Sequence, residues 1–349
     1  MISTLSSSPA TEPQAGKPLI EIDDLVVDYL TRGRTVRAVD HVSLSIQKGE
    51  IVGLAGESGC GKSTMANAVM QVLRAPAKQT GGRIFFNGED LSTKSEEQLR
   101  KFRWRNVSMV FQSAMNALNP VMRVGDQFVD MMRAHERISK KHAMARAGEL
   151  LSVVGIDPQR LRAFPHELSG GMRQRVIIAM ALALEPELIV MDEPTTALDV
   201  VVQREILQQI RDLQAERGFA VIFITHDLSL LLEIAHRVAI MYAGEIVESA
   251  PAASLRDGGR HPYTQGLIES FPPLLGPIER LTGIPGSPPD LALPPAGCRF
   301  HPRCPHCLVE NAELFARQTN ERPVLREIEA GHFVACHLVE EQEWTQLSR

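Results

Sequence analysis

The stretch Gly56-Glu57-Ser58-Gly59-Cys60-Gly61-Lys62-Ser63 fits the pattern G-x-x-x-x-G-K-[ST], in which a glycine-rich loop cradles phosphate groups. The apolar residues 51–54 before it favour a strand, and residues 63–73 after it favour a helix. In that context, glycines let backbone N–H groups converge on phosphate oxygens, and the helix N-terminus adds partial positive charge. Lys62 is placed to reach the outer phosphates and Ser63 to hold Mg²⁺. The stretch therefore predicts a site for a nucleoside triphosphate.

Three other apolar segments, each typical of a buried strand, end in polar side chains. These side chains are Gln112, Asp192 followed by Glu193, and His226. Open α/β sheets bind ligands at the carboxyl ends of their strands, so we expect these residues beside the phosphate loop. There Asp192 suits a magnesium role, and Gln112 could contact both metal and water. Glu193 could deprotonate a water molecule, and His226 could meet the γ-phosphate.

A second predicted anion site precedes the acidic strand. Ser169, Gly170 and Gly171 begin a predicted helix, whose first N–H groups have no intrahelical partner and can bind an anion. Two anion-binding helix ends in one domain are expected if one of them serves a nucleotide held by another copy. The motifs together indicate an ATPase that works as a face-to-face pair.

Strands alternate with helices along most of the chain, which implies an α/β fold with a mainly parallel sheet and helices on both faces. Residues 124–154 have a helical pattern. Residues 1–18 are rich in Ser, Thr, Pro and Ala without the apolar core of a signal peptide, so we expect a disordered lead. Prolines gather after His261, and we expect a boundary near residue 260 between residues 19–260 and an extension at 261–349.

Composition excludes several classes of protein. The net charge of −5 and the isoelectric point near 6.1 argue against a nucleic-acid partner. No apolar run approaches the roughly 18 residues that a membrane span needs. Cys60 lies in the phosphate loop, whereas the other four cysteines lie near the C-terminus. Disulfides are improbable in a reducing compartment, so those four cysteines need another explanation.

The motifs, in their order along the chain, resemble the full set of an ATP-binding-cassette (ABC) ATPase over about residues 20–260. The resemblance rests on residues 56–64, Gln112, residues 168–175, residues 188–193, Ala197-Leu198-Asp199 and His226. It implies an ABC fold with an antiparallel β subdomain and a helical subdomain, and two cassettes stacked head to tail around ATP and Mg²⁺.

The same resemblance implies a role for each matching residue. Glu193 would be the catalytic base, with His226 and Gln112 as sensors of the γ-phosphate and magnesium. The implied ATP ligands are Tyr29, which would stack on adenine, and Gly56, Glu57, Ser58, Gly59, Cys60, Gly61, Lys62, Ser63 and Thr64. The implied magnesium ligands are Ser63, Gln112 and Asp192. The implied contacts to the partner's ATP are Ser169, Gly170, Gly171 and Asp199.

The tail resembles the C-terminal extension of oligopeptide/dipeptide importer ATPases. The matching stretches are His261-Pro262-Tyr263-Thr264, Gly286-Ser287-Pro288-Pro289, residues 297–305 and residues 335–337. Residues 111–121 are similar to the segment that touches the membrane subunits in that group.

Some members of that group hold an iron–sulfur cluster on four tail cysteines, the ligand number of a [4Fe–4S] cluster. The matching cysteines are Cys298, Cys304, Cys307 and Cys336. The spacing differs here, because Asn311 stands where the third cysteine usually lies and Cys307 forms C-x-x-C with Cys304. A Zn²⁺ site and free thiols therefore stay open as alternatives.

The resemblance implies an energy-coupling subunit of a di- or oligopeptide importer. It would sit peripherally on the cytoplasmic face of the inner membrane. Its partners would be a second ATPase subunit (a paralogue or a copy of itself), two permease subunits and a solute-binding protein, with no nucleic acid. Nickel or oligosaccharides are alternative cargoes.

A DNA-repair or translation ATPase is disfavoured, because only about a hundred residues separate Lys62 from Ser169 and the chain has one motif set. A simple P-loop kinase would not need the Ser-Gly-Gly turn or His226.

Overall fold

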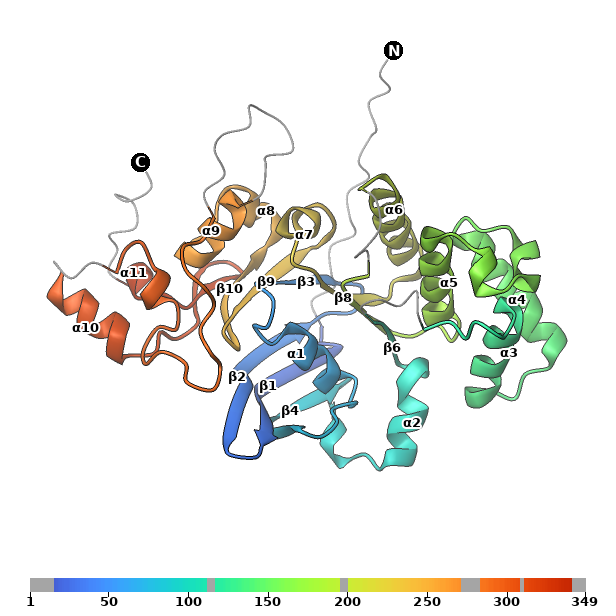
Figure 1. Ribbon diagram of the computed structural model, residues 1–349, viewed down its shortest axis with the longest axis horizontal. Coiled ribbons are helices and arrows are strands. Elements are labelled where there is room, and N and C mark those ends of the chain that lie inside the picture. The colour runs from blue at the N-terminus through green and yellow to red at the C-terminus, as the bar shows by residue number, and fades with distance from the viewer. Residues whose placement is uncertain (1–15, 112–116, 195–199, 271–282, 308–310, 341–349) are drawn as a thin grey trace, which may run out of the picture.

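The protein is described by a computed structural model that covers residues 16–111, 117–194, 200–270, 283–307 and 311–340 (Figure 1). An eight-stranded sheet has the order β11-β12-β10-β9-β3-β8-β7-β6. Its strands are β3 (Ile51–Ala55), β6 (Val107–Val110), β7 (Leu188–Asp192), β8 (Ala220–Ile224), β9 (Arg237–Tyr242), β10 (Glu245–Pro251), β11 (Arg326–Glu329) and β12 (His332–Val334). The five strands from β9 to β6 are parallel, which confirms the predicted α/β class with a mainly parallel sheet.

Eleven α-helices lie in the described residues. They are α1 (Lys62–Val69), α2 (Glu96–Arg105), α3 (Val124–His135), α4 (Lys140–Val153), α5 (Gly170–Leu182), α6 (Val200–Arg217), α7 (Leu228–Ile234), α8 (Ala252–Arg256), α9 (Pro262–Glu269), α10 (Ala312–Asn320) and α11 (His337–Glu340). In that part of the chain, no helix combines the length and apolarity that crossing a bilayer requires.

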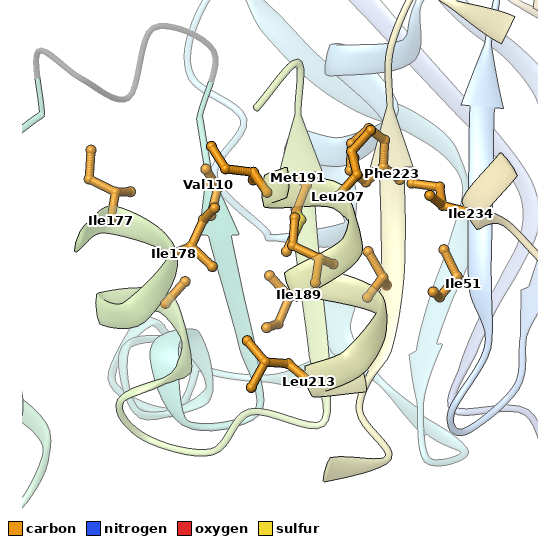
Figure 2. Packing of buried hydrophobic residues seen from close by; sticks show 14 of the residues in the cluster. Ile51, Val110, Ile177, Ile178, Ile189, Met191, Leu207, Leu213, Phe223 and Ile234 are labelled. Atoms are coloured by element: carbon orange, nitrogen blue, oxygen red, sulfur yellow. The ribbon is translucent and has the colours of Figure 1, made fainter. Parts of the chain in front are cut away.

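The parallel strands are apolar on both faces because both faces are covered. In β8, Val221 and Phe223 pack into one hydrophobic cluster, while Ala220, Ile222 and Ile224 pack into the other. Helices α5, α6 and α7 cover the first face, where side chains such as Leu207 and Ile234 meet the sheet (Figure 2). Strands buried on both sides read as continuous apolar runs, which is why the sequence predicted them well.

A smaller antiparallel sheet packs over the second face. It consists of β1 (Ile20–Thr31), β2 (Arg34–Ile46), β4 (Ala77–Phe86) and β5 (Glu89–Asp90), in the order β2-β1-β4-β5. Helix α1 lies between the two sheets and contacts strands of both (Figure 1). The start of α1 is therefore fixed by packing on two sides.

A helical subdomain containing α3, α4 and α5 lies beside β6 (Figure 1). The helical pattern predicted over residues 124–154 is interrupted here, because Glu136 has an extended backbone and Ser139 caps a new helix. The predicted helix at residues 63–73 is also too long. It ends at Val69, and Gln71 takes a left-handed conformation with φ of 54°.

The register of the parallel strands aligns their carboxyl ends along one edge of the sheet. Leu54 of β3 pairs with Ile224 of β8, which pairs in turn with Asp192 of β7. Met191 of β7 pairs with Val110 of β6. The polar residues that follow these strands therefore emerge at the same edge of the sheet, beside the start of α1.

The C-terminal extension, residues 261–349, contributes strands to the main sheet. Strand β12 pairs antiparallel with β10, and β11 pairs antiparallel with β12. The sequence did not predict these strands, which have four residues or fewer and lie at the sheet edge. The boundary near residue 260 stays a prediction, and backbone pairing continues across it.

Candidate nucleotide-binding site

The phosphate loop leaves β3 in a conformation that requires glycine. Gly56 and Gly61 have φ of 146° and 111°, a region that L-residues rarely adopt. A Cβ on Gly56 would lie 2.2 Å from the carbonyl oxygen of Met241, and one on Gly61 would lie 2.2 Å from that of Ala38. The loop is thus pressed against the backbones of β9 and β2, and any larger residue would push it out of place.

Lys62 lies across this loop. Its Nζ donates hydrogen bonds to the carbonyl oxygens of Gly56 at 2.7 Å and Glu57 at 2.8 Å, and the side chain is buried. Gly61 is the N-cap of α1 and has no side chain to cap the helix, so the first N–H groups are available to an anion. The loop, the lysine and the helix end meet as the sequence predicted.

Tyr29 stands next to the loop from the smaller sheet. It is half-buried at the end of β1, and its hydroxyl lies 3.1 Å from Oγ1 of Thr64. An aromatic ring at this position can face a base attached to a phosphate chain in the loop. Stacking on adenine stays a prediction.

Asp192 and Ser63 form a pair of oxygen donors at the end of β7. The Ser63 side chain lowers the pKa of the Asp192 carboxyl, but burial outweighs this effect and raises that pKa. The carboxyl oxygen Oδ1 is buried and has no hydrogen-bond partner among the described residues. Mg²⁺ prefers carboxylate and hydroxyl oxygens, so an orphaned buried carboxylate oxygen beside a serine fits this ion.

Glu193 and His226 lie side by side at the ends of β7 and β8. His226 Nδ1 is 3.4 Å from Glu193 Oε1, and the histidine side chain is 63% exposed whereas that of Glu193 is 18% exposed. Glu193 has φ of 46°, and its N–H donates to the carbonyl of Ile224. A strained backbone at a polar strand end is common at functional sites, and here it accompanies a carboxylate close to the phosphate loop.

Ser169 is placed as predicted at a helix start but apart from the loop. Its hydroxyl accepts from the N–H of Met172 and caps α5, and the residue is exposed. Helix α5 contacts β6, which is three strands away from β3 in the sheet. At about 4.8 Å per strand this is roughly 14 Å sideways. The chain therefore presents Ser169, Gly170 and Gly171 at a separate surface position.

Two predicted site residues, Gln112 and Asp199, lie outside the described residues. Their roles stay predictions.

Sequence reasoning missed that the C-terminal extension reaches the phosphate loop. Arg303 forms two hydrogen bonds with the Glu57 carboxylate, and the Tyr263 hydroxyl accepts from the Glu57 N–H. Tyr263 belongs to the tail stretch His261-Pro262-Tyr263-Thr264, and Arg303 lies between Cys298 and Cys304. No local signal connects residues separated by more than 200 positions.

The tail cysteines gather without forming a metal site. Cys298, Cys304 and Cys336 are close enough to influence one another electrostatically, and the N–H of Cys307 donates to the Cys304 carbonyl. Burial raises the pKa of Cys298 to about 12 and that of Cys304 to about 11, which favours neutral thiols. Over the described residues, no three His, Cys, Asp or Glu side chains are placed to hold a metal ion. A cluster or a zinc site on these cysteines stays a prediction.

A parallel sheet that leads from β3 through a glycine-rich loop into α1, with acidic residues at the end of a neighbouring strand, defines a P-loop nucleotide-binding domain. Comparison with known proteins identifies its family. Residues 39–196 match the ABC transporter family, and residues 247–310 match the family described as oligopeptide/dipeptide transporter, C-terminal region.

Relatives match almost the whole chain. The oligopeptide transport ATP-binding protein OppD of Bacillus subtilis is 43% identical over 92% of this chain and 89% of its own length. The dipeptide transport ATP-binding protein DppD of Escherichia coli is 41% identical over 91% of this chain and 96% of its own. A solved dimeric structure of MJ0796, a bacterial ABC transporter cassette, is 29% identical with a TM-score of 0.60, covering 67% of this chain and 98% of that one.

The chain belongs to the ATP-binding proteins of ABC transporters, in the group that carries the oligopeptide/dipeptide C-terminal region. It is an ABC ATPase.

We expect Asp192→Asn to stabilise the protein in the absence of nucleotide at neutral pH. Burial raises the pKa of this carboxyl in the folded state, so its ionisation costs stability as pH rises from the unfolded value through the folded one. The advantage of the variant should disappear in acid, where the carboxyl is protonated in both states. Thermal unfolding across a pH series measures it.

The exposed Asp130→Asn is the matched control and should leave the unfolding midpoint unchanged. A variant at Asp192 that is less stable than wild type at neutral pH would mean that favourable interactions of the carboxylate outweigh the cost of its burial.

Proposed function

We propose that this protein is the ATP-hydrolysing, energy-coupling subunit of an importer of di- and oligopeptides. One observation carries the proposal: relatives named as oligopeptide and dipeptide transport ATP-binding proteins match about nine-tenths of the chain, extension included. No feature of the described residues favours nickel or oligosaccharides as cargo.

The proposed chemistry begins with nucleotide binding. The N–H groups of the phosphate loop and the start of α1 hold the β- and γ-phosphates, and Lys62 turns from the loop carbonyls to the outer phosphates. Ser63 and Asp192 would hold Mg²⁺, which supplies positive charge to the phosphoryl group. Their proximity and the unpaired oxygen of Asp192 support this assignment. Tyr29 would stack on the adenine.

Glu193 is the proposed catalytic base, and His226 the proposed contact to the γ-phosphate. A carboxylate at this strand end can orient a water molecule and take its proton as the oxygen attacks phosphorus. The 3.4 Å separation from His226 supports a shared task, because the exposed imidazole can hold the carboxylate in place and still reach a phosphate oxygen. Gln112 is proposed to contact the metal and the water.

The second half of each catalytic centre is proposed to come from a partner ATPase subunit. Ser169, Gly170 and Gly171 lie exposed or half-exposed at a helix N-terminus, away from the loop of their own chain. Across a head-to-tail pair they would face the partner's ATP, with Asp199 as a further contact. Membership of the family supports permease partners, and we propose a solute-binding protein and peripheral attachment at the cytoplasmic face of the membrane.

We expect Glu193→Gln to retain ATP binding while hydrolysis falls by about 100-fold or more, since general base catalysis contributes 10²–10⁴-fold. ATP-bound pairs should accumulate, because binding closes the pair and hydrolysis reopens it. Steady-state phosphate release and size-exclusion chromatography with ATP measure the two effects. Unchanged hydrolysis would remove Glu193 from the catalytic role.

The same variant tests the cargo. Cells whose single gene copy encodes Glu193→Gln should lose uptake of labelled di- and oligopeptides, while uptake of a free amino acid by another route stays constant. Normal peptide uptake with defective nickel or oligosaccharide uptake would overturn the peptide assignment.

We expect Ser169→Arg to abolish pairing and turnover while ATP still binds to the single chain. Arginine at this helix start would clash with the partner's nucleotide, whereas the loop of its own chain is left intact. The matched control is Ser139→Arg, which removes the equivalent cap of α4 in the same subdomain and so carries the same cost of about 1 kcal/mol. Full turnover by Ser169→Arg would contradict the shared-site proposal.

A [4Fe–4S] cluster on Cys298, Cys304, Cys307 and Cys336, or alternatively Zn²⁺, is a separate proposal. The number of possible ligands and the proximity of three of these thiols support it. Protein purified without oxygen should contain iron and acid-labile sulfide in equal amounts, lost on Cys336→Ser and kept in the control Cys60→Ser. Iron-free protein would end the cluster hypothesis.

A further inference from the structure

The phosphate loop carries an acidic side chain that the C-terminal extension neutralises. Arg303 Nη1 lies 2.7 Å from Glu57 Oε2, and Nη2 lies 3.0 Å from Oε1. This two-fold, parallel arrangement is the strongest form of an ion pair between these residue types. The partners are 246 positions apart in the sequence.

The Arg303 side chain is held firmly on its own side of the contact. It is 6% exposed, and its Nε donates to the carbonyl of Pro285 at 2.7 Å. Its guanidinium lies over the rings of Tyr242 and Phe300. The Glu57 side chain is 25% exposed, so this pair is screened less by solvent and salt than a surface pair would be.

The extension makes a second contact with the same residue. The N–H of Glu57 donates to the hydroxyl of Tyr263 at 2.8 Å, and Tyr263 is fully buried against Tyr242 and Phe300. Both the backbone and the side chain of Glu57 are therefore bound by the extension, while its carbonyl accepts from Lys62. This residue connects the extension to the lysine of the phosphate loop.

The electrostatic consequence is specific. ATP carries several negative charges, and an unpaired carboxylate in the loop that receives its phosphates would repel them. Arg303 cancels that charge and draws the carboxylate to the side of the loop that faces the extension. The Glu57 carboxylate in turn neutralises the positive charge of Arg303. The favourable effect of Arg303 on ATP binding therefore depends on the presence of Glu57.

We propose that Arg303 is a positioning residue for ATP: the C-terminal extension neutralises Glu57 and fixes the start of the phosphate loop through Arg303 and Tyr263. The inference rests on the proposed function as an ATPase subunit. It assigns the extension a role in nucleotide affinity, in addition to any role of its cysteines.

The test is the dissociation constant for ATP in the full chain, measured by titration calorimetry for four proteins. Arg303→Gln leaves Glu57 unpaired and should weaken ATP binding at least about fivefold, the lower end of couplings between linked sites. Glu57→Gln removes the charge that Arg303 is proposed to neutralise. In that background, Arg303→Gln should change ATP affinity by no more than about twofold, the error of additive behaviour.

Comparing Arg303→Gln with and without Glu57→Gln separates charge neutralisation from a purely structural role. If Arg303 only stabilised the fold, Arg303→Gln would weaken ATP binding equally in both backgrounds, and that result would overturn the proposal. ATP affinity at the wild-type value in Arg303→Gln would overturn it as well. Thermal unfolding of each variant measures stability independently. Should Arg303→Gln fail to fold, Arg303→Met takes its place. Methionine removes the charge but keeps an apolar side chain against Tyr242 and Phe300, and the expected and contradicting results are the same.

The matched control is Arg34→Gln. Arg34 pairs with Asp290 at 3.4 Å and so also joins the main body to the extension, but both side chains are more than half exposed. ATP affinity of this variant should equal that of wild type. Failure of the wild-type chain to bind ATP at all would instead reject the proposed function, which keeps the two hypotheses distinguishable.

Discussion

Parallel pairing of β3, β8, β7 and β6 is the constraint on which the site depends. Their register sets Leu54, Ile224 and Asp192 side by side, so the residues that follow each strand emerge at one edge. Burial of both sheet faces fixes that register, because a slip of one residue would exchange the two apolar faces and misplace every polar strand end. The phosphate loop, the acidic pair and His226 come together for this reason.

The site contains groups that destabilise the folded chain and are uncommon in a core with a purely structural role. Asp192 is buried with an unpaired oxygen, Glu193 adopts an unfavourable backbone angle, and Gly56 and Gly61 press against neighbouring carbonyls. The buried carboxyl and the strained backbone of Glu193 cost folding stability, and burial of the apolar sheet offsets that cost. A cation at Asp192 and phosphates in the loop would satisfy the groups that folding leaves unpaired.

The C-terminal extension is structurally continuous with the nucleotide site. Its strands β12 and β11 extend the main sheet, and Arg299 forms an ion pair with Glu245 at 2.8 Å and another with Asp40. These contacts secure the stretch of chain that bears Arg303 and the tail cysteines. The extension thus contacts the phosphate loop from a segment that is itself bonded to the main body.

The sequence by itself determined the buried strands, the phosphate loop and the polar strand ends, because apolar runs, glycine positions and their order are local properties. It could not place the break at Ser139, the end of α1 at Val69 or the short edge strands β11 and β12, since packing and capping override weak local preference. Only the tertiary structure decided that Arg303 meets Glu57 and that Ser169 stands apart from its own loop. Those relations join residues distant along the chain, and only the folded packing of the sheet, the helical subdomain and the extension sets the distances between them.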